Sequence, residues 1–240
     1  MSTTLQFKAS LDSNSKPIVQ ALIDENLFKM KKEDRLDLGS GPTFKLKLGE
    51  NITIHEEVPK RAAMAFSKAF NDQLSKHPGA SAFMLNPLQV SEASVAALVD
   101  FIVGNSKTNK PFSLPTQGLQ LSEAIGLYHH GLIFGMERHV AALRAAILGQ
   151  VNDDKGPIIS YGALNELVRL PVHDRIYQAI VRKLEGLVHI KALDDDPEWP
   201  VWLKKNGMFR IEMENWKAIR EERAQKNRFD RNFPTLGKNA

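Results

Sequence analysis

The feature that most constrains the fold of this chain is a pair of alternating segments joined by a short polar turn. Apolar residues occupy every second position of residues 44–48 and again of residues 52–54, and the turn between them contains Gly49 and Asn51. Such alternation places the apolar side chains on one face of a strand, and a short turn with Gly and Asn joins two strands into a hairpin. One face of the hairpin must therefore be covered, and we expect helices to cover it.

The residues that follow have helical spacing. Pro59 is suited to a helix start, and apolar residues recur at intervals of three and four from Ala62 to Leu74. Residues 82–85 form a short apolar run that predicts a third strand. Further helices are expected at 91–104, closed by Gly104 and Asn105, and at 119–133 and 137–148. This order predicts an α+β fold with a small three-stranded sheet, the hairpin plus one strand, capped by a cluster of helices.

The two ends of the chain differ from this central part. A helical pattern at 16–29 lies within an N-terminal extension that the breaker cluster 39–42 closes. After residue 152, helical patterns cover 162–188, interrupted near Pro171, and the highly charged stretch 210–228. We therefore divide the chain into an extension at 1–42, a domain at 43–151, a C-terminal helical extension at 152–229 and a disordered tail at 230–240.

Composition argues against several classes of function. The chain has no cysteine, so it has neither a thiolate metal site nor a cysteine nucleophile. It has no phosphate loop, nucleophile elbow or dinucleotide fingerprint. We expect a protein that is not an enzyme and holds no cofactor or metal. The N-terminus has no apolar run typical of a secretory signal, and no stretch is long enough for a membrane span, so we expect a cytoplasmic or nuclear protein without membrane contact.

Three groups of residues could be taken for functional sites, but each has a simpler structural explanation. His129 and His130 are adjacent, so on a helix their side chains diverge by about 100° and do not readily share one metal ion. The acidic run 194–196 lacks the spaced ligands of a calcium loop and is better explained as a solvated loop. Trp199, Trp202, Phe209 and Trp216 lie in a charged region, where we expect them to dock the C-terminal extension onto the domain rather than to form an exposed patch.

Four stretches between residues 43 and 151 follow one another in a characteristic order. The hairpin at 44–54 is followed by a histidine at the end of the second strand, a valine, and two aromatic residues of the next helical segment. A strand with a helix at 85–104 and a Leu-Tyr pair at 127–128 come after them. Together these stretches resemble the BTB/POZ family. The residues we expect to define the fold are Leu46, Leu48, Ile54, His55, Val58, Phe66, Phe70, Leu98, Phe101 and Tyr128. The polar insert at 105–116 and the long C-terminal continuation are most similar to fungal members.

The resemblance implies a protein-interaction module that self-associates, recruits a protein partner through helix surfaces, or does both. The acidic residue that contributes to the family's domain-swapped homodimers is absent at Pro42 and Thr43. Leu74 and Lys76 correspond to the cullin-contacting pair of other members, but a lysine stands where those carry glutamate. A reversed charge weakens such a contact, so the sequence argues against cullin binding.

Charge distribution leaves a second hypothesis open. The formal net charge is +4, whereas the segment from Lys204 to Asn239 has ten Lys or Arg and five Asp or Glu. Arg223, Lys226 and Arg228 in this segment are candidate contacts to an acidic protein partner or to nucleic-acid phosphates. The alternative function is thus a nucleic-acid-associated regulator in which a BTB-like dimer presents a basic C-terminal helix.

Overall fold

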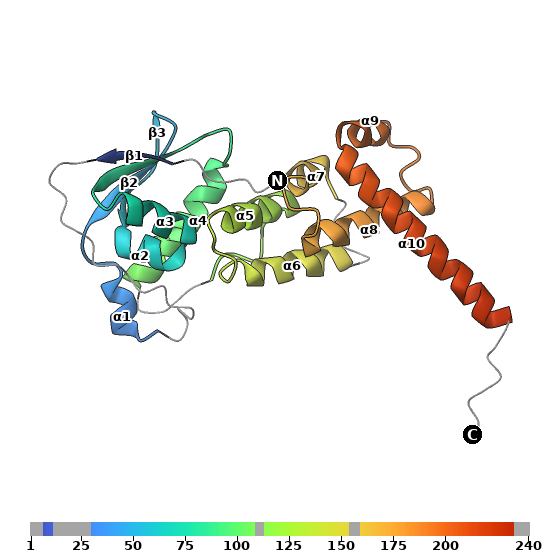
Figure 1. Cartoon of the computed structure of the whole chain (residues 1–240), viewed down its shortest axis with the longest axis horizontal. Helices are drawn as coiled ribbons and strands as arrows, with labels where there is room; N and C mark the ends of the chain where they lie inside the picture. The colour runs from blue at the N-terminus through green and yellow to red at the C-terminus, as the bar shows by residue number, and fades with distance from the viewer. Residues whose placement is uncertain (1–6, 12–29, 109–112, 154–158, 233–240) are drawn as a thin grey trace, which may run out of the picture. The chain divides into compact units, whose positions relative to one another are not determined.

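The computed structural model describes residues 7–11, 30–108, 113–153 and 159–232. The chain forms two compact units. The first, here called the sheet unit, comprises Met1–Ile147 and Ile158–Glu166, and the second, the helical unit, comprises Leu148–Pro157 and Leu167–Ala240. Figure 1 shows the strands in the sheet unit and only helices in the helical unit. The fold class is therefore mixed α+β, as the sequence predicts.

The sheet contains the predicted hairpin, β2 (Thr43–Leu48) and β3 (Ile52–Pro59), and the predicted third strand, β4 (Ala80–Leu85). β2 and β3 are antiparallel, while β4 lies parallel to β2 on its other side. The hairpin turns at Gly49, whose φ of 61° favours glycine. A fourth strand, β1 (Phe7–Leu11), pairs antiparallel with β4 and completes the order β1-β4-β2-β3.

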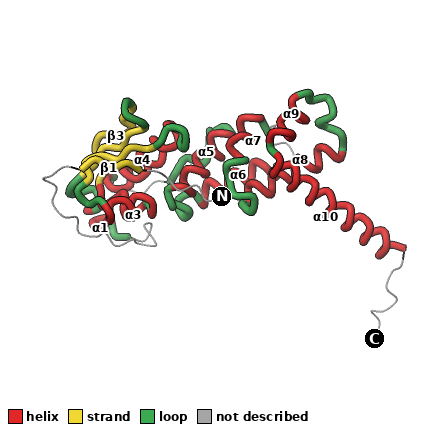
Figure 2. Tube along the Cα trace, turned by 45° about the horizontal axis from the view of Figure 1, so that its top comes forward, coloured by secondary structure: helices red, strands yellow, loops and turns green. Residues whose placement is uncertain are grey.

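Alternation along β2 gives the sheet one buried face. Phe44, Leu46 and Leu48 are buried, while the alternate positions are exposed or half-buried. Phe44 packs against Phe83 of β4 with ring centroids 5.2 Å apart, and against Phe70 at 5.4 Å. Helices lie on this side of the sheet (Figure 2). The apolar face predicted from spacing is thus the face that forms the core.

The helical pattern after Pro59 forms two helices, α2 (Lys60–Phe66) and α3 (Lys68–Lys76). They are separated at Ser67, whose hydroxyl accepts a hydrogen bond from the Phe70 amide at 3.2 Å and donates one to the Phe134 carbonyl at 2.7 Å. Ser67 thereby caps α3, which satisfies an amide at the start of that helix. The same side chain attaches α3 to the turn that follows α5.

Three further helices complete the core of the sheet unit: α4 (Glu92–Lys107), α5 (Leu121–Ile133) and α6 (Ala141–Asn152), whose last residues belong to the helical unit. Gly135, in the turn after α5, has a φ of 67°, and a Cβ there would lie 2.6 Å from the Lys68 Cβ. Glycine is therefore required for this turn to pack on α3.

The residues expected to define the fold are nearly all in this core. Leu46, Leu48, Val58, Phe66, Phe70, Leu98, Phe101 and Tyr128 are buried. Ile54 and His55, on the edge strand β3, are half-buried. The Nδ1 atom of His55 accepts a hydrogen bond from the Glu57 amide at 3.1 Å. The expectation that His55 ends the second strand is wrong, because β3 continues to Pro59.

The N-terminal region differs from the expected separate extension. It contributes β1 to the sheet and the helix α1 (Lys32–Asp37), which packs on α4. The helix expected at 16–29 lies outside the described residues, as does most of the tail expected to be disordered. α4 also continues past Gly104 to Lys107. In this last turn the Asn105 side-chain amide donates a hydrogen bond to the Phe101 carbonyl, and the Ser106 hydroxyl donates one to the Val103 carbonyl.

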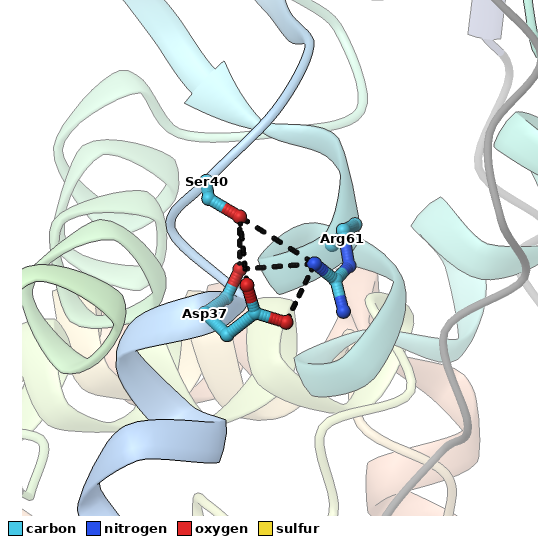
Figure 3. A network of polar contacts seen from close by, with 3 residues as sticks. All are labelled: Asp37, Ser40 and Arg61. Atoms are coloured by element: carbon cyan, nitrogen blue, oxygen red, sulfur yellow. Dashed lines mark hydrogen bonds and ion pairs between the residues drawn. The ribbon is translucent and has the colours of Figure 1, made fainter.

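Polar contacts attach α1 to its neighbours. The buried Arg35 donates a hydrogen bond to the Asn105 carbonyl, 2.9 Å away, near the C-terminal end of α4, which favours a cation. At the surface, Arg61 of α2 pairs with Asp37 at 2.8 Å and lies beside Ser40 (Figure 3). The hydrogen bond from Arg61 holds the pKa of the Asp37 carboxyl below its usual value.

The remaining helices are α7 (Tyr161–Leu167), α8 (Arg175–His189), α9 (Glu198–Lys205) and α10 (Gly207–Asn232). Residues up to Glu166 of α7 belong to the sheet unit, and the other three helices form the helical unit. α8 begins where the Asp174 carboxylate accepts a hydrogen bond from the Ile176 amide at 2.7 Å. The break predicted near Pro171 separates α7 from α8, whereas α9 is an element that the sequence pattern did not predict.

Candidate functional site

An aromatic cluster forms the centre of the helical unit. Tyr177 of α8, Trp199 and Trp202 of α9, and Phe209 of α10 are buried. Trp202 meets Phe209 edge-on with centroids 5.0 Å apart, and Tyr177 meets Phe209 at 5.7 Å. Burial raises the pKa of Tyr177 to about 12, with a further contribution from the Glu212 carboxylate. The tryptophans at 199 and 202 therefore anchor helices of the helical unit to one another, and being buried they do not form an exposed patch.

Polar side chains continue the contact between α8 and α10. The Gln178 side-chain oxygen accepts a hydrogen bond from Trp216 Nε1 at 2.8 Å, and its nitrogen donates to Glu212 at 3.1 Å and to the Val172 carbonyl at 2.7 Å. Arg182 lies over the Trp216 ring, 5.9 Å from its centroid, in a cation–π contact. Trp216 is half-buried and joins the two helices through its edge and its face.

An ion pair forms the last contact of this series. Arg220 Nη2 lies 2.8 Å from Glu185 Oε1, and the Glu185 side chain is only 9% exposed. Contacts along α8 and α10 rise together in residue number, from Tyr177 with Phe209 to Glu185 with Arg220, so the two helices run in the same direction. α8 ends at His189, whereas α10 continues to Asn232.

The C-terminal half of α10 extends past the other helices of its unit (Figures 1 and 2). Every residue from 221 to 228 is exposed. These residues carry charges of both signs, including the predicted contacts Arg223, Lys226 and Arg228. A helix that is polar on all sides gains little from the fold of its own unit. The chain therefore presents this half of α10, here called the free half-helix, to its surroundings.

Apolar side chains are exposed on the first half of the same helix. Met208 is 59% exposed, Ile211 44% and Ile219 37%. At about 100° per residue, these positions lie on one side of α10. A single exposed apolar residue is normal, but a row of them on one helix indicates a contact surface. We call these three residues the apolar stripe. The stripe is not evident from the sequence, because the buried anchors Phe209 and Met213 lie between its members and obscure the pattern.

The two candidate partner-binding residues of the sheet unit differ in their exposure to solvent. Lys76 is exposed at the end of α3, where a partner can contact it. The expectation for Leu74 is wrong, because its side chain is 1% exposed and belongs to the core. α3 turns Leu74 toward the sheet together with Phe70, four residues earlier on the same helical face. Leu74 therefore cannot contact a partner while the unit is folded.

Structural contacts account for the residues considered as metal ligands. His130 Nδ1 lies 2.6 Å from the Gly126 carbonyl, and His130 Nε2 accepts a hydrogen bond from the Ser91 amide at 2.9 Å. In the acidic run, Asp196 accepts a hydrogen bond from the Glu198 amide at the start of α9. Within the described ranges, no group of three or more His, Asp or Glu side chains is placed to hold a metal ion.

None of the helices in the described part of the chain combines the length and the apolar character that a membrane span requires. In comparisons with protein-family models, curated proteins and solved structures, the chain matches none of them.

Proposed function

We propose that this chain is a non-enzymatic, BTB/POZ-like protein-interaction module that recruits a protein partner through the surface of α10. The single observation that carries this proposal is the free half-helix, in which residues 221–228 are all exposed. Forming a helix that buries nothing fixes the backbone without the gain from packing that stabilises most helices in proteins. Contact with a partner supplies that gain.

The chemistry of α10 indicates what kind of partner fits. The apolar stripe offers burial, and Arg223, Lys226 and Arg228 offer charge-assisted contacts to carboxylates. An acidic protein surface with an apolar centre complements both features. The buried contacts from Tyr177 to Arg220 hold the first half of α10 in place, so the surface is pre-organised before the partner arrives.

A charge-reversal pair tests this proposal. We expect Arg223→Glu combined with Arg228→Glu to abolish recovery of a partner in affinity purification, because repulsion replaces attraction to an acidic surface. Lys32→Glu combined with Lys68→Glu is the matched control. Both lysines are exposed first residues of helices in the sheet unit, where glutamate is well tolerated. A partner recovered equally with both double variants would contradict the role of α10.

Self-association is a separate part of the proposal. Self-association is one of the two modes that the family resemblance implies, and size-exclusion chromatography with light scattering measures it directly. A strict monomer across the accessible concentration range would remove self-association and leave recruitment of a different protein. Charge reversal on α10 does not affect this measurement if the dimer forms through the sheet unit.

The second candidate function is nucleic-acid binding, which the surplus of basic residues from Lys204 onward favours. Binding of labelled DNA or RNA through phosphate contacts must weaken steeply between about 50 and about 200 mM salt. Fluorescence anisotropy over this range decides between the two functions. Salt-insensitive binding or none would exclude nucleic acid and leave the protein partner as the proposal.

A further inference from the structure

A turn in the helical unit combines negative charge with exposed apolar side chains. It spans the end of α8 and the loop that leads to α9, and we call residues 188–196 the acidic turn. Asp194 and Asp195 are exposed. In the same turn Val188 is 38% exposed and Ile190 is 69% exposed. An acidic surface with apolar side chains is what the chemistry of α10 calls for in a partner, and this chain carries one itself.

Backbone hydrogen bonds hold the acidic turn in one conformation. The Ala192 amide donates to the Leu187 carbonyl at 2.9 Å, and Lys191 has a φ of 60°, the left-handed conformation that commonly ends a helix. The Asp196 carboxylate then accepts a hydrogen bond from the Glu198 amide at 2.9 Å, where α9 begins. Because the turn is already ordered, little conformational entropy is lost when another molecule contacts it.

A face of α10 has the complementary composition. Ile219, Arg223 and Lys226 are spaced by four and three residues, so their side chains lie on one side of the helix. All three are exposed, Ile219 by 37%. We call these residues the basic face. Glu222 borders the basic face, and Lys191 in the acidic turn offers it an opposite charge.

The acidic turn and the basic face lie near each other. α8 and α10 run in the same direction and are joined by the pair of Glu185 and Arg220. Val188 lies three residues beyond Glu185 on α8, and Arg223 lies three residues beyond Arg220 on α10. Both surfaces therefore begin about one helical turn past this ion pair, at the same end of the two helices.

The charges of these two surfaces are not paired within the chain. Among the residues that the structure describes, Arg223 and Lys226 form no ion pair, and the same holds for Asp194 and Asp195. They are therefore available to another molecule. A surface that carries both signs of charge in neighbouring places complements itself when a second copy is turned by 180°.

We propose that the partner of α10 is a second copy of this chain, with the acidic turn of each copy seated on the basic face of the other. The exposed aspartates of the turn then meet Arg223 and Lys226 in charge-assisted contacts. The exposed isoleucines of the two surfaces, Ile190 and Ile219, remove apolar area from water. Each contact occurs twice about the two-fold axis, so the complex is a closed dimer. This inference rests on the proposed function, because it names the protein that the same helix recruits.

Sedimentation velocity of the full chain measures this dimer. The interface is small and rich in charge, so we expect association that becomes visible between about 5 and about 500 μM. The dissociation constant should rise by roughly tenfold or more between about 50 and about 500 mM salt, because salt screens exposed charges.

Two charge-reversal variants locate the contact. Arg223→Glu with Lys226→Glu gives the acidic-helix variant, and Asp194→Lys with Asp195→Lys gives the basic-turn variant. Like charges then face each other in both contacts of the dimer, so each variant alone should self-associate at least about tenfold more weakly. An equal mixture of the two variants pairs opposite charges again in both contacts. It should associate within about threefold of the natural chain.

Matched controls change the net charge equally at exposed positions of the sheet unit. Lys32→Glu with Lys68→Glu is the control for the acidic-helix variant, and Glu50→Lys with Glu57→Lys is the control for the basic-turn variant. Both controls should dimerise like the natural chain. Circular dichroism of every variant shows that lost association is not lost folding.

A monomer at every concentration, a dimer that either variant retains, or a mixture that stays monomeric would each overturn the proposal. A retained dimer would place self-association on another surface. If the chain is monomeric but recovery of a different protein still depends on Arg223 and Arg228, the second copy is excluded and recruitment by α10 stands. Loss of that dependence as well would remove the proposed function too.

Discussion

The sheet unit and the helical unit are stabilised by different kinds of contact. In the sheet unit, a chain of phenylalanine rings runs from Phe83 through Phe44 and Phe70 to Phe134, with neighbouring centroids 5.2 to 5.4 Å apart. In the helical unit, the aromatic cluster is followed by a series of polar contacts that ends in the pair of Glu185 and Arg220. A repeating apolar pattern in the sequence reveals the first kind of contact, whereas the second depends on pairs that only the fold brings together.

The largest expected effect is a loss of stability in the sheet unit alone. Phe70→Ala should destabilise the sheet unit by about 3–5 kcal/mol, because Phe70 is fully buried between Phe44 and Phe134. Urea denaturation followed by far-ultraviolet circular dichroism measures this loss. All the tryptophans, at 199, 202 and 216, lie in the helical unit, so their fluorescence reports on that unit.

The control for Phe70→Ala is Leu88→Ala, which removes a side chain that is 91% exposed in the same unit. It should leave both the dichroism transition and the tryptophan fluorescence transition unchanged. If Phe70→Ala shifts the tryptophan transition as far as the dichroism transition, the two units unfold together and the comparison fails.

Acid should destabilise the sheet unit, because the largely buried His139 ring must take up a proton. This ring packs against Phe66 and Phe101, with both centroids 5.3 Å away, and burial lowers its pKa from 6.5 to about 4. The unfolded chain therefore takes up a proton at higher pH than the folded chain does. The contribution of neutral His139 to the free energy of unfolding is fully present above pH 6.5. It is lost as the pH drops toward about 4, by at most about 3 kcal/mol.

Denaturation midpoints measured across this pH range test the assignment. His139→Phe keeps an aromatic ring between Phe66 and Phe101 but removes the titrating group. The variant should be less sensitive to acid than the natural chain over the same range. An unchanged pH dependence would show that other groups cause the acid sensitivity.

A smaller effect is expected from the ion pair of the helical unit. Arg220→Met leaves the buried Glu185 carboxylate without its cation and should cost about 1–3 kcal/mol, less than a fully buried pair because Arg220 is 30% exposed. Combining it with Glu185→Leu should restore much of the loss, since an apolar pair tolerates burial. Tryptophan fluorescence during denaturation measures both variants, and a double variant no more stable than Arg220→Met would contradict a role for the buried charge.

The smallest effect is expected at the surface of the sheet unit. Asp37→Asn removes the exposed ion pair with Arg61, and exposed pairs contribute little to stability. We expect faster hydrogen exchange in α1 and no change in the global transition. Loss of the whole unit on this substitution would mean that α1 is essential to the core and not an attachment to it.

Several elements followed directly from the sequence because their signals are local. The hairpin at β2 and β3, the strand β4 and the helix α10 were predicted from the spacing of neighbouring residues. The exposed positions of Arg223, Lys226 and Arg228 agree with the charged pattern of that helix. β1 was missed because an alternating segment of five residues is too short to distinguish from a polar terminus.

Other features depended on residues far apart in the chain. α9 was missed because eight residues carry a weak pattern, and its tryptophans pack against Phe209 of the next helix. α6 begins at Ala141, four residues later than expected, after the turn that Gly135 allows. In the sheet unit, residues of α4, α5 and α7 line one groove, and no short sequence motif marks it.

The sequence by itself determined that this chain has a one-sided hairpin followed by helices, because a period of two or of about 3.6 residues is a property of the backbone and its nearest neighbours. Only the tertiary structure decided that β4 lies beside β2, that Leu74 faces the core, and that Glu123 and Glu166 share a groove. Periodicity indicates that a helix or strand has an apolar face. What covers that face is decided by residues distant in the chain.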